Sequence, residues 1–475
     1  MRFLLHRPKI YFMKRGITVK RRMLLPLLAA LALLILWAAL RFGVGGKPLT
    51  ANLPAIAQTG VRDVMRVSLH YDAGTRTLRG TQALTAVNRS GQALNEAVVR
   101  LPMNAQDGES TLLSGVTVNG ERADFTLDEG DPTTLRVALT WAAGDTAEIA
   151  WTLLLRHPKA AGAAVVTLPG LSVWEEGAWR TDPYDSLTEP AYAAAFDYTV
   201  EVTCDKGVGA VFGGVLTAQR SEAGKTTYTA QLCGARDVSL ALLAGGRVKQ
   251  EMENGVLLTA LGQTVGEAGA LLARAKEALA DLAGAGFAYP FPALSVAAGD
   301  TGRADGTALS GLIALEAAGE KEALRRRITR LAARQTFGIL VESDPWNAPW
   351  LSVSLASAAE LLAYRQRSGQ AAFDARFYGE VDVATRLTRP AGVTVGADTA
   401  FFGSDREMTQ VLRDQGAAML LGLEMAAGEA AFADALALYV QENAGGIARQ
   451  TQLEDALLRA TGSDWSGYLA DELCW

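Results

Sequence analysis

The chain has 475 residues, of which 49% are hydrophobic and 20% are charged, with 45 basic and 51 acidic side chains. The length favours two or more domains, because one hydrophobic core rarely serves a chain of this size. The composition indicates a folded rather than a disordered protein. With the eight basic residues of positions 1–22 set aside, 37 basic and 51 acidic side chains remain, a net charge of about −14 that disfavours a nucleic-acid partner.

The cysteine and histidine content limits disulfide and metal chemistry. Three cysteines are too few for a disulfide scaffold, although Cys204 and Cys233 could form one bridge outside the cytoplasm or remain two separate buried thiols. The three histidines are His6, His70 and His157, so no histidine follows residue 157.

The first 60 residues have the pattern of a membrane anchor. Residues 1–22 carry eight basic and no acidic side chains, and residues 23–40 form an uncharged run, MLLPLLAALALLILWAAL. Eighteen helical residues span about 27 Å, close to the hydrocarbon thickness of a bilayer. We therefore expect a cytoplasmic tail over 1–22, one transmembrane helix over 23–42 and a linker over 43–60, with the rest of this cell-membrane protein outside the cytoplasm. A cleaved signal peptide is the alternative, but the apolar run is long for one and no small-x-small cleavage site accompanies it.

Between residues 61 and 250 the sequence has the pattern of a β domain. Apolar and polar residues alternate in runs such as VMRVSLHYD, TLRGTQALTAVN and TAEIAWTLLL, and turn signals such as NRSG and DEGDP separate the runs. Alternation with a period of two is typical of strands with one buried face. The pattern predicts an N-terminal antiparallel β-sandwich-like domain over 61–250.

The pattern changes after residue 250. TVGEAGALLARAKEALADLAGAG has apolar residues at helical spacing, a short strand ALSVAAG follows, and later segments such as KEALRRRITRLAARQTFGILVE and PWLSVSLASAAELLAYRQRSG are helical. We expect a mostly helical domain over 251–475. The whole chain is then an α+β multidomain protein preceded by one transmembrane helix.

Several separate stretches in the second half carry a shared pattern. They are FAYPFPALSVAAG, GTALSGLIAL, QTFGILVESDPWNAPWLSVSLAS and GEAAFADALALYV. Together they resemble the motifs of the membrane alanine aminopeptidase family of gluzincin metallopeptidases, and the resemblance covers about residues 60–475. It implies an N-terminal β domain followed by a thermolysin-like domain. It also implies a zinc site made by a His-Glu-x-x-His helix and a third Glu ligand, with the motif Glu polarising the attacking water.

The residues at these zinc-site positions differ from those of the family. The resemblance places Arg330 and Arg334 at the two histidines, Leu331 at the motif glutamate and Val353 at the third ligand. A guanidinium has no lone pair to give a metal and repels a dication, while aliphatic side chains neither ligate nor act as bases. We therefore expect neither zinc nor another cofactor, and degenerate catalytic positions.

Two further family positions are changed as well. Ala308 stands where the family has the glutamate that holds the substrate's amino group, and Arg413 where it has the tyrosine that stabilises the oxyanion. If Arg330 and Arg334 point into the cleft, these cations need partners. Glu360, on the next predicted helix, is expected to pair with one of them, so that an ion pair replaces the metal cluster.

The sequence therefore predicts a membrane-anchored extracytoplasmic pseudopeptidase, an aminopeptidase-like protein without zinc or peptidase activity. Its predicted role is to bind a peptide or small anion through Arg330, Arg334, Glu360 and Arg413, or to regulate an envelope protein partner. One alternative is a divergent zinc aminopeptidase with non-standard ligands. The second is a structural subunit of a membrane complex, in which the cleft is filled.

Overall fold

The computed structural model describes residues 62–105, 107–157, 162–184, 192–303, 305–382 and 393–474. The predicted tail, transmembrane helix and linker, over 1–22, 23–42 and 43–60, lie outside these residues. Within the described ranges, no single helix is long and apolar enough to cross a membrane. Two consecutive helical segments are long and apolar enough only when they are combined, Asp405–Ala427 and Glu429–Asn443. The chain bends by 120° between them.

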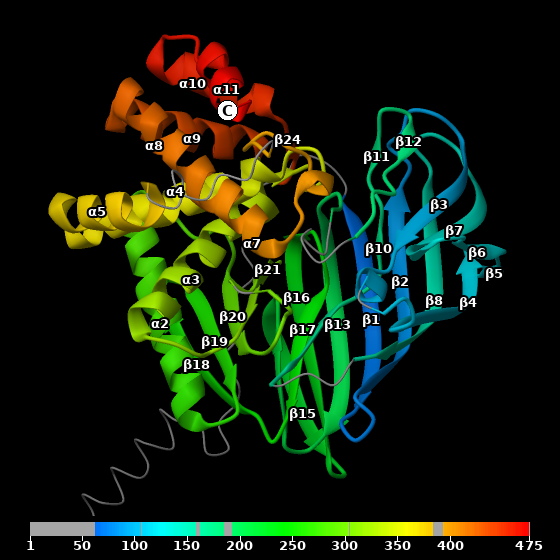
Figure 1. Ribbon diagram of the computed structural model, residues 1–475. Coiled ribbons are helices and arrows are strands. Elements are labelled where there is room, and N and C mark those ends of the chain that lie inside the picture. Colours follow the sequence, from blue (N-terminus) through cyan, green and yellow to red (C-terminus); the bar gives the residue numbers. More distant parts are fainter. Residues whose placement is uncertain are drawn as a thin grey trace, which may run out of the picture. The chain divides into compact units, whose positions relative to one another are not determined.

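An eight-stranded sheet forms the centre of the first half, with the strand order β15-β16-β13-β1-β2-β8-β4-β5 (Figure 1). In β1 (Asp63–Asp72) every second residue is buried, as the alternating sequence predicted. The other strands are β2 (Thr77–Val87), β4 (Thr111–Val118), β5 (Glu121–Arg122), β8 (Thr146–Arg156), β13 (Phe196–Asp205), β15 (Val215–Glu222) and β16 (Lys225–Ala235).

This sheet is mixed, so the prediction of an antiparallel sheet was wrong for one pair of strands. β1 pairs with β13 in parallel, whereas β2 and β16 pair with them antiparallel. Alternating burial shows which face of a strand meets the core, but it does not show the direction of the neighbouring strand. A parallel neighbour requires a long connection, and the strands between residues 77 and 179 lie within that connection.

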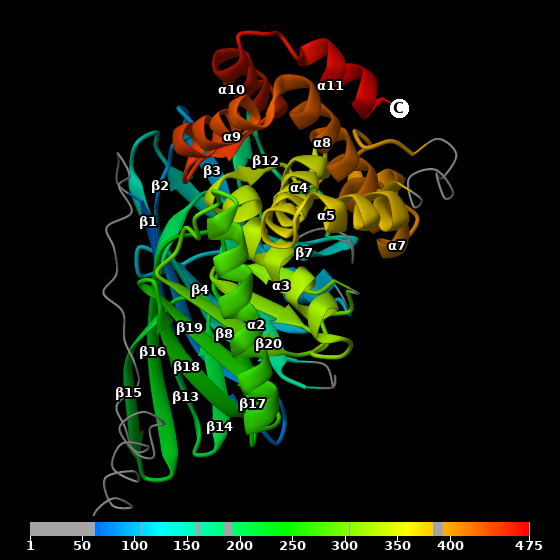
Figure 2. The same ribbon diagram turned by 90° about the vertical axis from the view of Figure 1, so that its left-hand side faces the viewer.

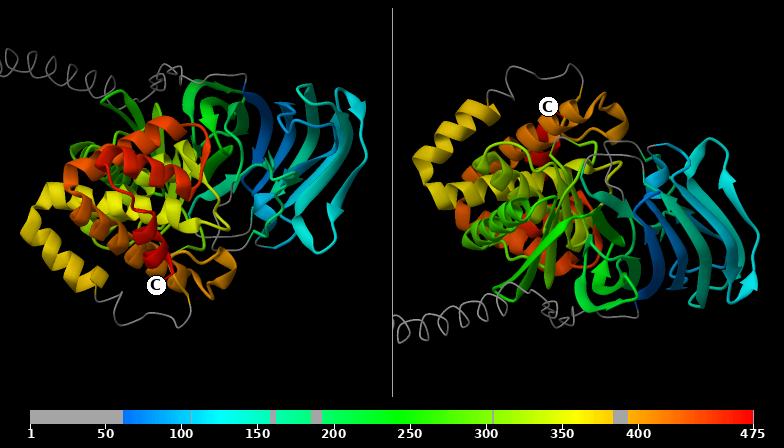
Figure 3. Two further views of the ribbon diagram at one scale, coloured as in Figure 1. Left: turned by 90° about the horizontal axis from the view of Figure 1, so that it is seen from above. Right: turned by 90° about the horizontal axis from the view of Figure 1, so that it is seen from below.

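Smaller sheets complete the first half, and Figure 3 shows its strands as two layers. The second layer has the order β10-β3-β7-β6, with β3 (Leu94–Arg100), β6 (Phe125–Asp128), β7 (Asp131–Trp141) and β10 (Gly170–Leu171). A three-stranded sheet, β14-β17-β9, contains β9 (Ala164–Thr167), β14 (Val208–Phe212) and β17 (Ser239–Ala244). A 3-10 turn η1 (Pro102–Ala105) and the hairpin of β11 (Trp174–Glu175) and β12 (Ala178–Trp179) connect these strands. Buried side chains of both layers, such as Trp151 and Val137, belong to one hydrophobic core.

The second half begins with a five-stranded sheet of the order β18-β19-β20-β22-β21, so it is less exclusively helical than predicted. Its strands are β18 (Arg247–Glu253), β19 (Val256–Gly262), β20 (Ala293–Ala298), β21 (Thr307–Leu309) and β22 (Leu312–Leu315), of which the sequence predicted β20 alone. The missed strands β21 and β22 are buried throughout, and a short, continuous apolar run often does not reveal its secondary structure. Helix α2 (Val265–Gly284) lies along this sheet (Figure 2), and Thr264 caps its first turn.

The rest of the second half is helical, as predicted. The helices are α3 (Lys321–Arg334), α4 (Pro349–Ser368), α5 (Gln370–Arg376), α7 (Asp405–Met408), α8 (Gly416–Ala427), α9 (Glu429–Asn443), α10 (Gln450–Thr461) and α11 (Ser466–Leu473). Between them lie three segments with the wider π-helical turn, η2 (Gln335–Leu340), η3 (Phe377–Asp382) and η5 (Thr409–Gln415), and a 3-10 turn η4 (Thr399–Phe401). The short strands β23 (Glu342–Ser343) and β24 (Ile447–Ala448) pair in parallel.

Arg236 joins the two halves of the described chain. It follows β16 and is almost fully buried, and its guanidinium donates hydrogen bonds to the carbonyls of Ala193, Ile339 and Gly446, at 2.9, 3.0 and 2.6 Å. A buried guanidinium needs such partners because an unpaired one would be costly. These bonds fix η2, which continues α3, against the β-sheet half.

Cys204 and Cys233 are both free thiols. Cys204 in β13 lies opposite Thr226 of β16, and Cys233 is seven positions further along that strand. Seven strand residues span about 23 Å, whereas a disulfide needs Cα atoms within about 7 Å. The strand register therefore excludes the bridge that the sequence had left open.

Candidate functional site

Five of the residues singled out from the sequence line one small cavity between α3, α4 and η5. Arg330, Leu331 and Arg334 come from α3, Val353 from α4 and Arg413 from η5. The cavity has a volume of about 50 Å³. We call it the arginine cleft. Its other lining residues are Arg303, Asp305, Gly306, Asp405, Met408 and Thr409.

The end of α3 positions the arginines of this cleft. Arg330 and Arg334 are four residues apart and therefore lie on one face of the helix. The fully buried Gln335 then accepts a hydrogen bond from the Gly311 amide and donates one to the Leu309 carbonyl, both at 2.9 Å. These two bonds hold the end of α3 against the turn between β21 and β22.

Ala308 and Glu360 lie outside the lining of the arginine cleft. Ala308 is buried in β21 opposite Ile313. Where the resemblance led us to expect an amine-binding glutamate, the chain thus has only the buried methyl group of Ala308. Glu360 lines a second cavity next to the cleft.

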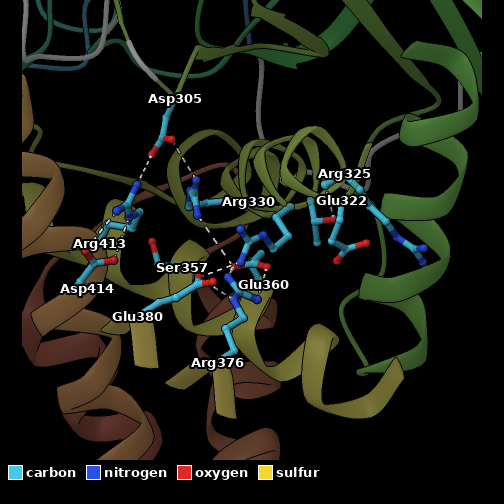
Figure 4. Close-up of polar contacts among 12 residues, drawn as sticks. Asp305, Glu322, Arg325, Arg330, Ser357, Glu360, Arg376, Glu380, Arg413 and Asp414 are labelled. Carbon is cyan, nitrogen blue, oxygen red and sulfur yellow. Dashed lines mark hydrogen bonds and ion pairs between the residues drawn. The ribbon is translucent and has the colours of Figure 1, made fainter. Parts of the chain in front are cut away.

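Arg330 has two carboxylate neighbours (Figure 4). Its Nη2 lies 3.1 Å from Oδ1 of Asp305, and its Nη1 lies 3.8 Å from Oε2 of Glu360. The contact with Glu360 is of the kind expected from the sequence, which left the choice between Arg330 and Arg334 open. Glu360 has a closer partner in Arg376, which donates two hydrogen bonds to it, of 2.8 and 2.7 Å. Sequence reasoning missed both Asp305 and Arg376.

Arg413 has acidic partners on two sides. Its Nη1 lies 3.1 Å from Oδ2 of Asp305, and its Nε lies 2.8 Å from Oδ1 of Asp414. Asp305 therefore bridges Arg413 and Arg330, with one carboxylate oxygen on each guanidinium (Figure 4). Burial would raise the pKa of Asp305, but the charges of the two arginines outweigh this effect and hold the pKa below its usual range. Asp305 is consequently ionised at neutral pH.

The donor set at this place does not fit zinc. Arg330 and Val353 offer no lone pair, and Arg334 donates a hydrogen bond of 3.3 Å to Oγ of Ser352. Leu331, which the sequence resemblance placed at the motif glutamate, is a buried aliphatic side chain. Across the part of the chain that the structure describes, no group of three or more His, Cys, Asp or Glu side chains is placed to hold a metal ion.

A larger cavity of about 230 Å³ adjoins the arginine cleft, and Asp305, Arg330 and Arg413 line both. We call it the ion-pair cavity. Its other lining residues are Ala323, Arg326, Arg327, Ser357, Glu360, Leu361, Arg376, Glu380, Val381 and Asp414. Five arginines face four carboxylates here, so the charges nearly balance. Among the residues that line the arginine cleft, four arginines face two carboxylates. Glu360 and Asp414, which line only the ion-pair cavity, also contact Arg330 and Arg413.

Comparison with known proteins gives a match at the level of the fold. A scan against protein-family models finds no match, and a search of curated proteins finds none either. Among solved structures, the chain is similar to an M1 zinc metallopeptidase from Deinococcus radiodurans, with 19% identity and a TM-score of 0.60, over 86% of this chain and 92% of that one.

Two related structures match to a similar extent. A mutant M1 zinc metallopeptidase from the same organism, bound to a Tyr-Ser-Ala substrate, has 20% identity and a TM-score of 0.62, over 87% of this chain and 94% of that one. A two-domain M1 zinc metallopeptidase mutant bound to L-arginine has 18% identity and a TM-score of 0.62, over 90% and 95% of the two chains. The described chain thus has an aminopeptidase-like fold, with a β-rich first half and a largely helical second half, as the sequence resemblance predicted.

Proposed function

We propose that this protein is a zinc-free pseudopeptidase, which binds a peptide or a small anion in its arginine cleft without cleaving it. The observation that carries the proposal is that Arg330, Arg334 and Val353, at the expected metal-ligand positions, meet in one cavity. Guanidinium groups bind carboxylates through paired, charge-assisted hydrogen bonds. The cleft therefore suits an anionic group, whereas the amine-binding position is the methyl group of Ala308.

Peptides are the ligand class that the fold neighbours favour. One of them was solved with a tripeptide substrate and another with a free amino acid. Both kinds of ligand contain a carboxylate, which the excess of arginine in this cleft would attract. Fold likeness alone licenses no activity, and it is the arginines of the cleft that support binding.

The proposal includes a membrane anchor at residues 23–42, with the described residues outside the cytoplasm. The basic tail and the uncharged run of the sequence support it. An alkaline wash should then leave the protein in the membrane fraction, and a C-terminal epitope should be labelled on cells whose cytoplasmic membrane is intact. Release by the wash, or labelling only after permeabilisation, would count against this topology.

The first experiment is a metal analysis by mass spectrometry combined with an aminopeptidase assay. Both use the full-length protein in detergent, purified without chelators, beside a zinc aminopeptidase of similar fold as the positive control. We expect no stoichiometric zinc and no turnover, with or without added zinc. Stoichiometric zinc together with chelator-sensitive turnover would overturn the proposal and support a divergent metallopeptidase.

One observation favours a second candidate, a structural subunit of a membrane complex. Arg330 and Arg413 already have carboxylate partners within the chain. If these pairs are permanent, the cleft needs no ligand. Absence of binding to any carboxylate-bearing peptide, together with copurification of one defined membrane protein, would support this candidate.

A further inference from the structure

We infer that the arginine cleft recognises a carboxylate and that Asp305 is its built-in competitor, so that ligand binding exchanges one carboxylate for another. The inference rests on the proposed function. It adds the chemical group that is bound and the residue that controls access to it.

Asp305 shows which group fits the cleft. It lies in the loop between β20 and β21, and its two oxygens contact Nη2 of Arg330 and Nη1 of Arg413, each at 3.1 Å. One carboxylate thus spans two guanidinium groups that belong to separate helical segments. An incoming carboxylate can make the same two charge-assisted contacts if Asp305 moves away.

Asp305 is also the acidic side chain best able to leave. Three carboxylates pair with Arg330 or Arg413 among the described residues, and their side-chain exposures differ. Asp305 is 27% exposed, whereas Glu360 is 3% and Asp414 is 13% exposed. A partly exposed carboxylate on a loop regains more hydration when its ion pair opens than a buried one does.

The two arginines keep acidic neighbours after Asp305 has left. Arg330 retains its contact with Glu360, and Arg413 retains its contacts with Asp414. Neither guanidinium is therefore stripped of partners during the exchange. Because each arginine has a second acidic partner, replacing Asp305 by a ligand carboxylate costs less free energy than opening an isolated buried ion pair.

The position of Asp305 gives the exchange a steric consequence. Asp305, Arg330 and Arg413 line both the arginine cleft of about 50 Å³ and the ion-pair cavity of about 230 Å³. The Asp305 side chain is therefore one of three that the two cavities share. Movement of this side chain would join them, and the joined space would admit the end of a peptide together with its carboxylate.

The test is calorimetric titration of the full-length protein in detergent with three acetylated tripeptides. Acetyl-Ala-Ala-Ala offers a C-terminal carboxylate, acetyl-Ala-Glu-Ala amide offers a side-chain carboxylate, and acetyl-Ala-Ala-Ala amide offers none. We expect Asp305→Asn to bind at least one of the first two about tenfold more tightly than the wild type. The peptide that gains identifies the source of the carboxylate. The uncharged amide should gain nothing.

Asp414→Asn is the matched control, because it removes the same charge from the same arginine without opening the bridge between Arg330 and Arg413. It should change the affinity by less than about threefold. An equal gain in both variants, or none in Asp305→Asn, would overturn the inference. If the wild type binds a carboxylate peptide but Asp305→Asn binds it no more tightly, only the role of Asp305 as a competitor fails. If neither carboxylate peptide binds to any of the three proteins, the proposed function fails as well.

A measurement on the wild type keeps the inference testable if Asp305→Asn does not fold. Hydrogen exchange of the loop that carries Asp305 should become faster when the carboxylate peptide is added, because the side chain loses its two ion pairs. Unchanged or slower exchange in the peptide-bound protein would contradict the exchange of carboxylates.

Discussion

Glu360 accepts two hydrogen bonds from Arg376, of 2.8 and 2.7 Å, and the two side chains are only 3% and 9% exposed. The pair ties α4 to the end of α5 and lies next to Arg330 of α3. Two charges removed from water are tolerated only while they remain paired. Glu360 therefore belongs to the packing of the helices as well as to the candidate site.

This pairing predicts a large loss of stability when Arg376 alone is changed. Arg376→Gln leaves the buried Glu360 with Arg330 as its remaining cation, at 3.8 Å and without the two hydrogen bonds of Arg376, and we expect the free energy of unfolding to fall by about 3 kcal/mol. Urea denaturation measures the change. Arg326→Gln is the control, since its partner Glu380 is 59% exposed, and it should cost less than about 1 kcal/mol. Equal losses for the two variants would show that burial of this pair does not matter.

A second prediction concerns the close approach of α4 and α8. A Cβ atom on Gly416 would lie 2.0 Å from Oγ of Ser354, whose hydroxyl donates a hydrogen bond of 2.8 Å to the Leu412 carbonyl. Gly416→Ala should therefore lower the free energy of unfolding by about 1 to 3 kcal/mol. Ser354→Gly should restore part of this loss in the double variant. Gly467→Ala, in α11 with no atom within 4 Å of the added Cβ, should cause no loss.

The contact between Arg180 and Asp344 predicts a pH dependence. Nη1 of Arg180, which follows β12, lies 2.8 Å from Oδ2 of Asp344, which precedes α4. Burial would raise the pKa of Asp344, but hydrogen bonds from Arg180 and Asn347 outweigh it and hold the pKa below its usual range. A lowered carboxyl pKa contributes stability above the unfolded value of about 3.9 and loses it as the pH falls through the folded value.

The stability difference between the wild type and Asp344→Asn should therefore be greatest at neutral pH and shrink below about pH 4. Urea denaturation over this pH range measures it. The exposed Asp434 provides the control, because Asp434→Asn should change the free energy of unfolding little at neutral pH. A difference for Asp344→Asn that stays constant in acid would contradict the role of its charge.

The three cysteines should differ in their reactivity towards a thiol reagent. Cys204 is fully buried, and burial raises its pKa to about 11, whereas Cys474 is exposed. Cys474 should react within the folded protein, and Cys204 only after unfolding, because the thiolate is the reactive form. Intact mass should show all three thiols available after denaturation without reductant. A mass shift on reduction would reveal a disulfide and contradict the strand register.

Much of the β-sheet half could be predicted from the sequence, because alternating burial follows directly from strand geometry. The parallel pairing of β1 with β13 could not, since alternation carries no information on strand direction. The strands β19 and β22 were missed because short buried apolar runs lack a distinctive period.

The candidate site was predictable where motif spacing fixed a position, and it was missed where only tertiary structure does. Arg330, Arg334 and Val353 meet in one cavity because two helices with recognisable motifs carry them. Asp305 and Arg376 lie in a loop and at the end of a short helix, at distances along the chain that no local pattern links to Arg330. Chemistry alone indicated that a buried arginine such as Arg330 needs an acidic partner. It did not indicate which aspartate or glutamate of the chain that partner is.

The run of contacts from Arg376 through Glu360, Arg330 and Asp305 to Arg413 bears on how readily this chain could acquire a metal. Arg330→His alone would leave Asp305 and Glu360 with one cation fewer, and Arg334 and Val353 would also have to change. Asp305 would keep Arg413 and Glu360 would keep Arg376, but each carboxylate would lose one of its two cationic contacts in a partly or fully buried setting, which costs stability. Because each charge contacts more than one partner, replacing these residues one at a time would destabilise the protein at each step. Conversion to a metal-binding protein is therefore harder than the small number of altered positions suggests.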